Sequence, residues 1–327
     1  IYIFHLIAML YTENVDRGSK DLVQKLSLLI FPVIIGTGPK LTKLMREMAI
    51  KFFVLGTLTA VFFGFISSAI EYSSTGSISV FYMSDFSPSH HPSYISFYLV
   101  IALAMLLLRI EKSTNSKRAL LLWIAVLFLS LSLIFPASKM GFINWAMVFF
   151  VFLLKWLILK PYHRKAAVLL LGAGLLFILF LKFDPVASNR VEKAVEVTSQ
   201  MDQPNKESQV ESNTARLYSW STALMIIKEN PIGVGTGDIN DAMVSAYNKQ
   251  GLDDLAAKSL NPHNEFLQIG VAIGIPAALL FLFSLVFPFG KIIREKDWIY
   301  GIFLLSIFIQ FSVESMLEKQ SGVIFFA

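Results

Sequence analysis

The sequence has no cysteine and few charged residues. The absence of cysteine among its 327 residues excludes disulfide bridges, thiolate metal sites and cysteine nucleophiles. Charged residues make up only 16%, whereas a typical soluble domain has roughly 25%. Hydrophobic residues reach 55% and the mean hydropathy is +0.63. This composition excludes a soluble or disordered protein and indicates a membrane protein.

The charge balance is mildly basic, with a net charge of +5 and a pI of about 9.2. In a membrane protein such a surplus usually reports the topology of the loops. The aromatic and basic residues do not interleave as they do in nucleic-acid-binding segments, so we expect a lipid bilayer and no nucleic acid as partner. Both ends lie inside apolar runs, and we expect a piece of a longer protein, cut within a helix at each end.

The apolar runs predict an all-α fold, a polytopic bundle of transmembrane helices. A spanning helix needs about 20 mostly apolar residues, and a helix satisfies its own backbone hydrogen bonds in lipid. We expect about eight complete spans plus two truncated ends, at 1–10 and 322–327. The run 22–38 contains Pro32 and is expected to be kinked, tilted or re-entrant. The other expected spans are 49–70, 92–110, 119–138, 140–159, 166–182, 264–289 and 298–316.

Basic residues alternate between successive loops, which predicts the orientation. The basic loops are 36–48, 109–118, 160–165 and 290–297, and basic loops face the cytoplasm. The loop 71–91, the turn 138–140 and the long polar segment 183–262 then lie on the outer face. We therefore divide the chain into N-terminal transmembrane helices (1–182), one large outer loop domain (183–262) and C-terminal transmembrane helices (263–327).

The outer loop domain is expected to contain short helices. Residues 184–213 are polar and are expected to be weakly structured. Residues 214–229 predict a helix that Thr214 caps and that ends before Pro231. Four apolar residues recur at helical spacing and form one apolar stripe: Leu217, Trp220, Leu224 and Ile227.

His263 is the candidate general base. The outer face has no supply of nucleotides, so an enzyme there needs a donor that is already activated, such as a lipid-linked pyrophosphate. An imidazole has a pKa near 6.5 and suits proton transfer near neutral pH. We expect the following helix to begin at Pro262 or His263, where free N–H groups favour an anion. A histidine that only caps the helix or marks the membrane interface is the alternative.

Two cations are candidates for binding phosphate. Arg216 lies in the first turn of the 214–229 helix, where a cation opposes the helix dipole, which hints at an anionic partner. Lys139 follows Ser138 in a turn between two spans and is either a phosphate ligand or a lysine that snorkels to the interface. The turn that contains Gly233, Gly235 and Gly237 is either a phosphate cradle or a plain turn.

A metal site is not expected. His90 and His91 are adjacent, and no set of acidic or histidine partners has ligand spacing. We expect Asp253 and Asp254 to be solvated. Glu314 and Glu318, near the end of the last full span, either line a cavity or pair with a lysine.

Several motifs in order resemble the O-antigen ligase and polymerase family of bacterial envelope proteins. The resemblance covers most of the chain, but its specific part is about 65 residues. It is quite specific for the family and separates ligase from polymerase poorly. The motifs are Ser138-Lys139-Met140-Gly141, the helix Thr214–Trp220, the loop Asn230–Gly237, the segment Asn261–Gln268 that contains His263-Asn264, and Gly274-Ile275-Pro276.

The resemblance implies a multi-pass enzyme of the bacterial inner membrane with its active site on the periplasmic side. Such enzymes take a glycan from an undecaprenyl-pyrophosphate donor without a metal or nucleotide cofactor. A ligase passes the glycan to lipid A-core, and a polymerase passes it to another lipid-linked repeat unit. The family's essential arginine and histidine match Arg216 and His263. Lys139 stands where arginine is common in the family. A lysine lacks the planar pair of N–H donors with which an arginine binds phosphate in a bidentate manner.

We expect a metal-independent, inverting glycosyltransferase of the ligase type. In this hypothesis Arg216 and Lys139 neutralise the pyrophosphate and His263 accepts the proton of the acceptor hydroxyl. A polymerase of the same family, a polysaccharide transporter and a non-catalytic scaffold are the alternatives. The expected substrate-binding residues are Lys139, Ser138, Asn264, Gly233, Gly235, Gly237, His91 and Tyr94.

Overall fold

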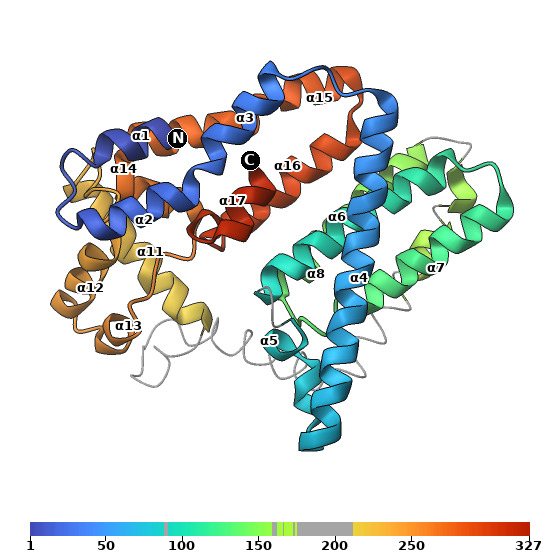
Figure 1. Cartoon of the computed structure of the whole chain (residues 1–327), viewed down its shortest axis with the longest axis horizontal. Coiled ribbons are helices and arrows are strands. Elements are labelled where there is room, and N and C mark those ends of the chain that lie inside the picture. The colour runs from blue at the N-terminus through green and yellow to red at the C-terminus, as the bar shows by residue number, and fades with distance from the viewer. Residues whose placement is uncertain (88–90, 159–161, 166, 173, 175–211) are drawn as a thin grey trace. The chain divides into compact units, whose positions relative to one another are not determined.

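The computed structural model describes residues 1–87, 91–158, 162–165, 167–172, 174 and 212–327. No strand occurs among these residues, so the all-α class is confirmed (Figure 1). The elements in chain order are α1 (Tyr2–Ala8), α2 (Val15–Lys25), α3 (Ser27–Thr37), α4 (Lys43–Thr75), η1 (Ile78–Phe81), α5 (Met83–Phe86), α6 (Pro92–Lys112), α7 (Ser116–Ser132), α8 (Lys139–Ile158), α11 (Ser212–Glu229), α12 (Ile239–Lys249), α13 (Asp253–Ala257), α14 (Glu265–Val286), α15 (Phe289–Glu295), α16 (Trp298–Phe311), η4 (Met316–Glu318) and α17 (Gln320–Phe326).

Four segments are long and apolar enough to cross a membrane by length and composition. They are α4, α6, α8 and the run Glu265–Glu295, which comprises α14 and α15. Each overlaps an expected span. The expectation of several helices that can span a membrane is therefore confirmed by length and composition.

The other expected spans form shorter elements. α7 has 17 residues and α16 has 14, while the Pro32 run forms α3, which has 11 residues. The expected span 166–182 and the polar residues 184–211 lie largely outside the described residues. The count of eight spans, the outer loop domain and the orientation therefore stay predictions.

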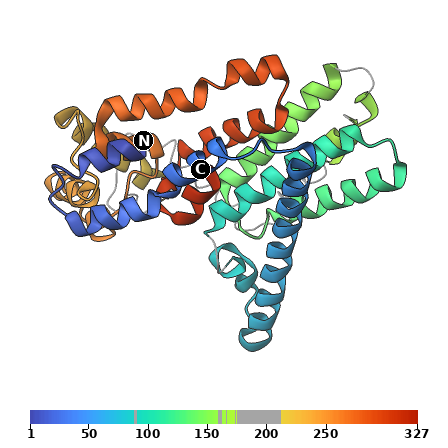
Figure 2. The same ribbon diagram turned by 45° about the horizontal axis from the view of Figure 1, so that its top comes forward.

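The chain divides into two compact units. Unit 1 comprises Ile1–Pro39, Val191–Glu295 and Ile307–Ala327. Within it, α1 packs against α14 and the C-terminal α17 packs against α2 and α3, so segments from both ends of the chain lie together (Figures 1 and 2). α11 packs between α14 and α12. This grouping follows packing, whereas the expected division at residues 182 and 262 follows membrane topology and stays a prediction.

Unit 2 comprises Lys40–Arg190 and Lys296–Ser306. Its centre is α6, which packs against α4, α7 and α8 and is buried along most of its length. The core contains large side chains such as Phe152 and Trp156. One charged pair is enclosed in it: Lys155 Nζ lies 2.7 Å from Glu111 Oε2. α4, by contrast, leaves many large apolar side chains exposed, as expected for a helix that faces lipid.

Candidate active site

The turn before α14 places His263 outside the helix. Asn264 is the N-cap, and its Oδ1 accepts a hydrogen bond from the Leu267 N–H at 3.1 Å. The helix therefore begins at Glu265, and the expectation that it begins at Pro262 or His263 is wrong. His263 has φ +47°, a left-handed conformation that a histidine rarely adopts, and its N–H donates to Asn261 Oδ1 at 3.0 Å.

Hydrogen bonds tie this turn to the segment between α16 and α17. The Asn264 side chain donates to Ser312 O at 2.9 Å, and the Asn264 N–H donates to Ser315 Oγ at 3.2 Å. The buried Glu265 accepts the Leu317 N–H at 2.8 Å. Both the Nδ2 and the Oδ1 of Asn264 thus make hydrogen bonds within the protein. The role of Asn264 in substrate binding stays a prediction.

Arg216 and His263 meet at Glu314. Arg216 Nη2 lies 3.6 Å from Glu314 Oε2, and His263 Nδ1 lies 3.4 Å from Glu314 Oε1. The side chains of Arg216 and His263 are 25% and 30% exposed and that of Glu314 is 16% exposed. The two expected catalytic residues, from α11 and the α14 turn, therefore converge on one carboxylate that solvent still reaches.

This arrangement suits an imidazole that accepts a proton. His263 Nδ1 is buried and has no hydrogen-bond partner among the described residues, and 3.4 Å is slightly long for a hydrogen bond. Such bonds are often long in a site without substrate and tighten when it binds. If Nδ1 carries the proton toward Glu314, Nε2 is left as the basic nitrogen.

The packing face of α11 differs from the expected stripe. Leu217 and Leu224 of the stripe are 43% and 56% exposed and so do not face the core. The buried face instead carries four residues that are small or bear a hydroxyl, together with one large apolar residue, Ile226; the four are Ala215, Ser219, Thr222 and Ala223. Small side chains let α11 approach α12 and α14 closely, which a pattern of large apolar residues does not reveal.

A buried tyrosine holds α11 to α12. The Tyr247 hydroxyl, with its single proton, lies within hydrogen-bond distance of two acceptors, Ser219 Oγ at 2.9 Å and Leu260 O at 3.1 Å. Burial raises the pKa of Tyr247 to about 12, so the hydroxyl keeps its proton. These bonds fix the helix that carries Arg216.

α14 is broken near its middle. Gly274 has φ +84°, and Pro276 lacks an N–H group. The break leaves the carbonyls of Val271 and Ala272 without their usual partners within the helix.

The glycine-rich loop fills that break. The N–H groups of Val234 and Gly235 donate to Val271 O at 2.8 Å and Ala272 O at 3.1 Å, and the Ile275 N–H donates to Pro231 O at 2.9 Å. The loop Asn230–Gly237 and the Gly274–Pro276 motif therefore form one interlocked element. These N–H groups are engaged within the protein, which favours a packing role for the loop over a phosphate cradle.

The three glycines of the loop are needed for close packing. Gly233 and Gly235 have φ +95° and +117°, which favour glycine. A Cβ at Gly233 would lie 2.5 Å from Ala272 O, and one at Gly237 would collide with Asn14 O. Contact of Gly233, Gly235 and Gly237 with substrate stays a prediction.

Two hollows border this loop within unit 1. A cavity of about 780 Å³ is lined by Val234 and by the polar side chains Tyr11, Glu13, Asp238 and Asp241, among others. A smaller one of about 230 Å³ is lined by Gly237, Thr236 and charged groups that include Arg17, Asp21 and Glu318. Side chains of this kind can bind the hydroxyl groups of sugars.

Ser138 and Lys139 begin α8 in unit 2. Ser138 Oγ accepts the Gly141 N–H at 3.3 Å, so Ser138 acts as a cap. A Cβ at Gly141 would lie 2.6 Å from Ser96 Cβ, so this glycine lets α8 approach α6. Lys139 is exposed at the first helical position. Its role in binding phosphate stays a prediction.

His91 and Tyr94 lie at the start of α6. His91 is the N-cap, and its Nδ1 accepts the Ser93 N–H at 3.3 Å. The Tyr94 ring is buried and meets the His91 ring edge-on, with centroids 6.1 Å apart. Capping and packing account for both residues without a ligand, and their contact with substrate stays a prediction.

The expected site residues thus fall into two groups. His263, Arg216, Asn264 and the loop glycines belong to unit 1, and Ser138, Lys139, His91 and Tyr94 belong to unit 2. Among the described residues, no group of three or more histidine or acidic side chains has the geometry of a metal site.

Two features of unit 1 were not assigned to the site from the sequence. Glu314, which joins Arg216 to His263, was noted only as a carboxylate near the end of an apolar run. Lys25 is buried and paired with Asp21 and Glu318, and its only sequence signal is a basic residue inside a mainly apolar run. Their partners lie far away in the sequence, where no local pattern points to them.

Comparisons with known proteins bear on the family of the chain. The family model described as O-antigen ligase matches residues 124–282. Two Rickettsia proteins that carry the provisional name of polysaccharide ligase are each 27% identical to the chain. The match to the Rickettsia felis protein (strain ATCC VR-1525 / URRWXCal2) covers 81% of this chain and 61% of that protein. The match to the Rickettsia conorii protein (strain ATCC VR-613 / Malish 7) covers 76% and 56%.

The chain thus spans about three fifths of the length of these relatives. The matched segment includes Lys139, Arg216 and His263. The resemblance expected from the motifs is therefore confirmed: over residues 124–282 this chain matches the O-antigen ligase family.

Proposed function

We propose that this chain is the catalytic part of a membrane glycosyltransferase of the O-antigen ligase type. It moves a glycan from an undecaprenyl-pyrophosphate donor to an acceptor hydroxyl on the periplasmic face of the inner membrane. The observation that carries the proposal is the convergence of Arg216 and His263 on Glu314, directly before the first turn of a helix long enough to span the membrane. A base, a cation and an orienting carboxylate are the groups that such a transfer requires.

Arg216 stabilises the leaving group. A guanidinium can bind a phosphate through two parallel hydrogen bonds, and Arg216 holds Glu314 by an ion pair of 3.6 Å that leaves other N–H groups available. Compensating the negative charge that develops on the pyrophosphate lowers the barrier to its departure.

His263 activates the acceptor. The acceptor hydroxyl gives its proton to His263 Nε2 while its oxygen bonds to the anomeric carbon. The bond between that carbon and the pyrophosphate oxygen breaks, and its electron pair leaves with undecaprenyl pyrophosphate. Because attack is in line with the leaving group, the anomeric configuration inverts. The reaction uses the energy of the activated donor and needs no metal or nucleotide.

The names of the relatives favour a ligase over a polymerase. Both are named as polysaccharide ligases, and in that reading the acceptor is lipid A-core or another envelope glycan. The residues placed in the reaction, Arg216, His263 and Glu314, gather at the N-terminal end of α14, which favours transfer chemistry over transport.

Deletion of the gene tests the proposal. We expect the loss of long glycan chains and the accumulation of lipid-linked polymer, and we expect the wild-type gene but not the His263→Asn variant to restore the chains. If the acceptor in the deletion strain carries one repeat unit in place of a long chain, the chain is a polymerase and not a ligase. Unchanged glycans, or full restoration by His263→Asn at normal abundance, would contradict the proposal.

A further inference from the structure

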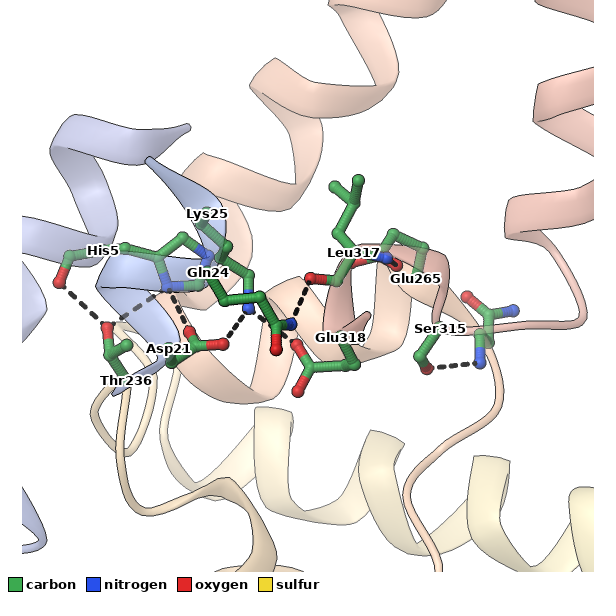
Figure 3. Close-up of polar contacts among 10 residues, drawn as sticks. His5, Asp21, Gln24, Lys25, Thr236, Glu265, Ser315, Leu317 and Glu318 are labelled. Carbon is green, nitrogen blue, oxygen red and sulfur yellow. Dashed lines mark hydrogen bonds and ion pairs between the residues drawn. The ribbon is translucent and has the colours of Figure 1, made fainter. Parts of the chain in front are cut away.

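A buried charge network joins α2 to η4. Lys25 is 1% exposed; its Nζ forms an ion pair with Asp21 and lies 2.8 Å from Glu318 Oε1 (Figure 3). Next to it, His5 lies 3.9 Å from the Asp21 carboxylate and contacts Thr236 Oγ1 at 3.2 Å. The network therefore connects the N-terminal helices to the segment that follows Glu314.

Such a network is costly to bury. A lysine taken out of water loses hydration that its ion pairs only partly restore, and apolar residues of similar size often give equal stability. Burial raises the pKa of Asp21 to about 6, although Lys25 opposes that rise. A gain in stability therefore explains the network poorly. Its position in the fold suggests a different role.

The network reaches the active site through η4. Besides the Lys25 pair to Glu318, Gln24 Nε2 donates to Leu317 O at 3.3 Å. From the other side, Glu265 accepts the Leu317 N–H at 2.8 Å and the Asn264 N–H donates to Ser315 Oγ. The residue just before this clamped turn is Glu314, which contacts Arg216 and His263.

We propose that Lys25 and Gln24 are positioning residues that hold η4, and with it the Glu314 carboxylate, in register with Arg216 and His263. This inference rests on the proposed function for its kinetic consequence. Its structural part, that α2 fixes the segment around Glu314, stands independently of any activity.

The expected kinetic effect is on the chemical step. The partners of Lys25 and Gln24 in the described part of the chain are Asp21, Glu318 and Leu317, and not the residues proposed for catalysis. Donor binding should therefore change little. A catalytic group displaced by about 1 Å can cost up to about 100-fold in rate. Loss of the clamp should therefore lower kcat while KM for the lipid-linked donor stays within about threefold.

The test removes the pair and does not merely break it. Lys25→Met alone would leave the carboxylates of Asp21 and Glu318, whose side chains are 11% and 24% exposed, without their cation, which destabilises the fold. The double variant K25M/E318Q removes the ion pair to η4 and lowers the buried negative charge. We expect it to reach normal abundance with kcat lowered about 10- to 100-fold, and we expect Lys25→Arg to stay near the wild-type rate.

Unit 2 offers a matched control. Lys155 and Glu111 are also a buried lysine–glutamate pair, with Nζ 2.7 Å from Oε2. The double variant K155M/E111Q makes the same chemical change away from η4 and should leave kcat unchanged. An equal loss of kcat in both double variants would mean that any buried pair matters and would overturn the proposal.

A second readout does not depend on glycan transfer. The chain has no cysteine, so spin labels can be placed at Leu217→Cys on α11 and Lys319→Cys after η4, both exposed positions. Labels in the full chain should give a narrow distance distribution that broadens or shifts in K25M/E318Q and not in K155M/E111Q.

The two readouts separate the possible failures. If the wild-type chain transfers no glycan but the label distance responds, the proposed function fails and the clamp stands. If the distance stays narrow and unchanged in K25M/E318Q, Lys25 does not position this segment and the inference is overturned, whatever the rate. A broadened distance with unchanged kcat in an active enzyme would also overturn it.

Discussion

Two histidines precede apolar helices in this chain, and they differ in how their side chains are used. His91 lies before α6 and caps that helix with its own Nδ1, at 3.3 Å from the Ser93 N–H. His263 lies before α14, where the next residue, Asn264, makes the cap. The His263 ring is thus released from capping, and its Nδ1 faces Glu314 at 3.4 Å.

The two helix starts also differ in backbone conformation. At α6 a proline at the first helical position and an extended residue before it form an ordinary helix entry. At α14 the His263 backbone is left-handed, a conformation with an energetic cost for a histidine. Backbone strain, together with a buried ring nitrogen that has no hydrogen-bond partner among the described residues, is the reason why we propose a catalytic role for His263 and not for His91.

Replacing His263 should have the largest effect. Asparagine tolerates the left-handed backbone, so His263→Asn removes the imidazole and preserves the turn. We expect the rate of glycan transfer by the purified enzyme to fall about 10²- to 10⁴-fold. A rate near that of the wild type, at equal abundance, would show that His263 takes no part in the proton transfer. His263 would then be, like His91, a histidine without a role in catalysis.

Replacing Arg216 should cause the second-largest loss of activity. Loss of a group that stabilises the leaving charge typically costs about 10²- to 10³-fold in kcat, and we expect Arg216→Ala to show this loss. Arg216→Lys should recover only part of the rate, because an ammonium provides charge without the planar pair of donors. Full recovery by lysine would show that charge alone is required; an unaffected alanine variant would place Arg216 outside the site.

Glu314 should have an intermediate effect. Glu314→Gln keeps the size of the side chain and removes the charge that orients the imidazole and pairs with Arg216. We expect transfer to fall by up to about 100-fold, with abundance close to normal because Glu314 retains some exposure. The variant Glu318→Gln is not a suitable control, because Glu318 pairs with Lys25; Glu71→Gln, at an exposed position of α4, is.

His91 should have the smallest effect. His91→Ala removes one capping hydrogen bond, which is worth about 1 kcal/mol at a helix N-terminus. We expect a slightly lower midpoint of thermal unfolding and a transfer rate within about twofold of the wild type. A tenfold loss of rate at normal stability would instead support the expectation that His91 contacts the substrate.

The spans and motifs could be predicted from the sequence because their signals are local. Runs of apolar residues placed α4, α6, α8 and α14, and Asn230-Pro231 placed the end of α11. The start of α14 was misplaced because proline at a first helical position is a common signal, whereas here Asn264 supplies the cap two residues later.

The contacts that assemble the site could not be predicted in the same way. Glu314 joins Arg216 to His263 and Lys25 pairs with Glu318, and these pairs are brought together only by the packing of helices. The interlocking of the glycine loop with the break in α14 is similar: glycine and proline signalled a turn and a break, but not that each satisfies the other's backbone groups.

The most direct test of the central claim is a double-mutant cycle on the single-turnover rate of glycan transfer. It compares Glu314→Gln, His263→Asn and the variant that carries both. If Glu314 acts through His263, the double variant should be about as slow as His263→Asn alone, because residues that act as a unit are not additive. Losses that multiply would show that the two side chains act independently, and the site described here would then not exist as a unit.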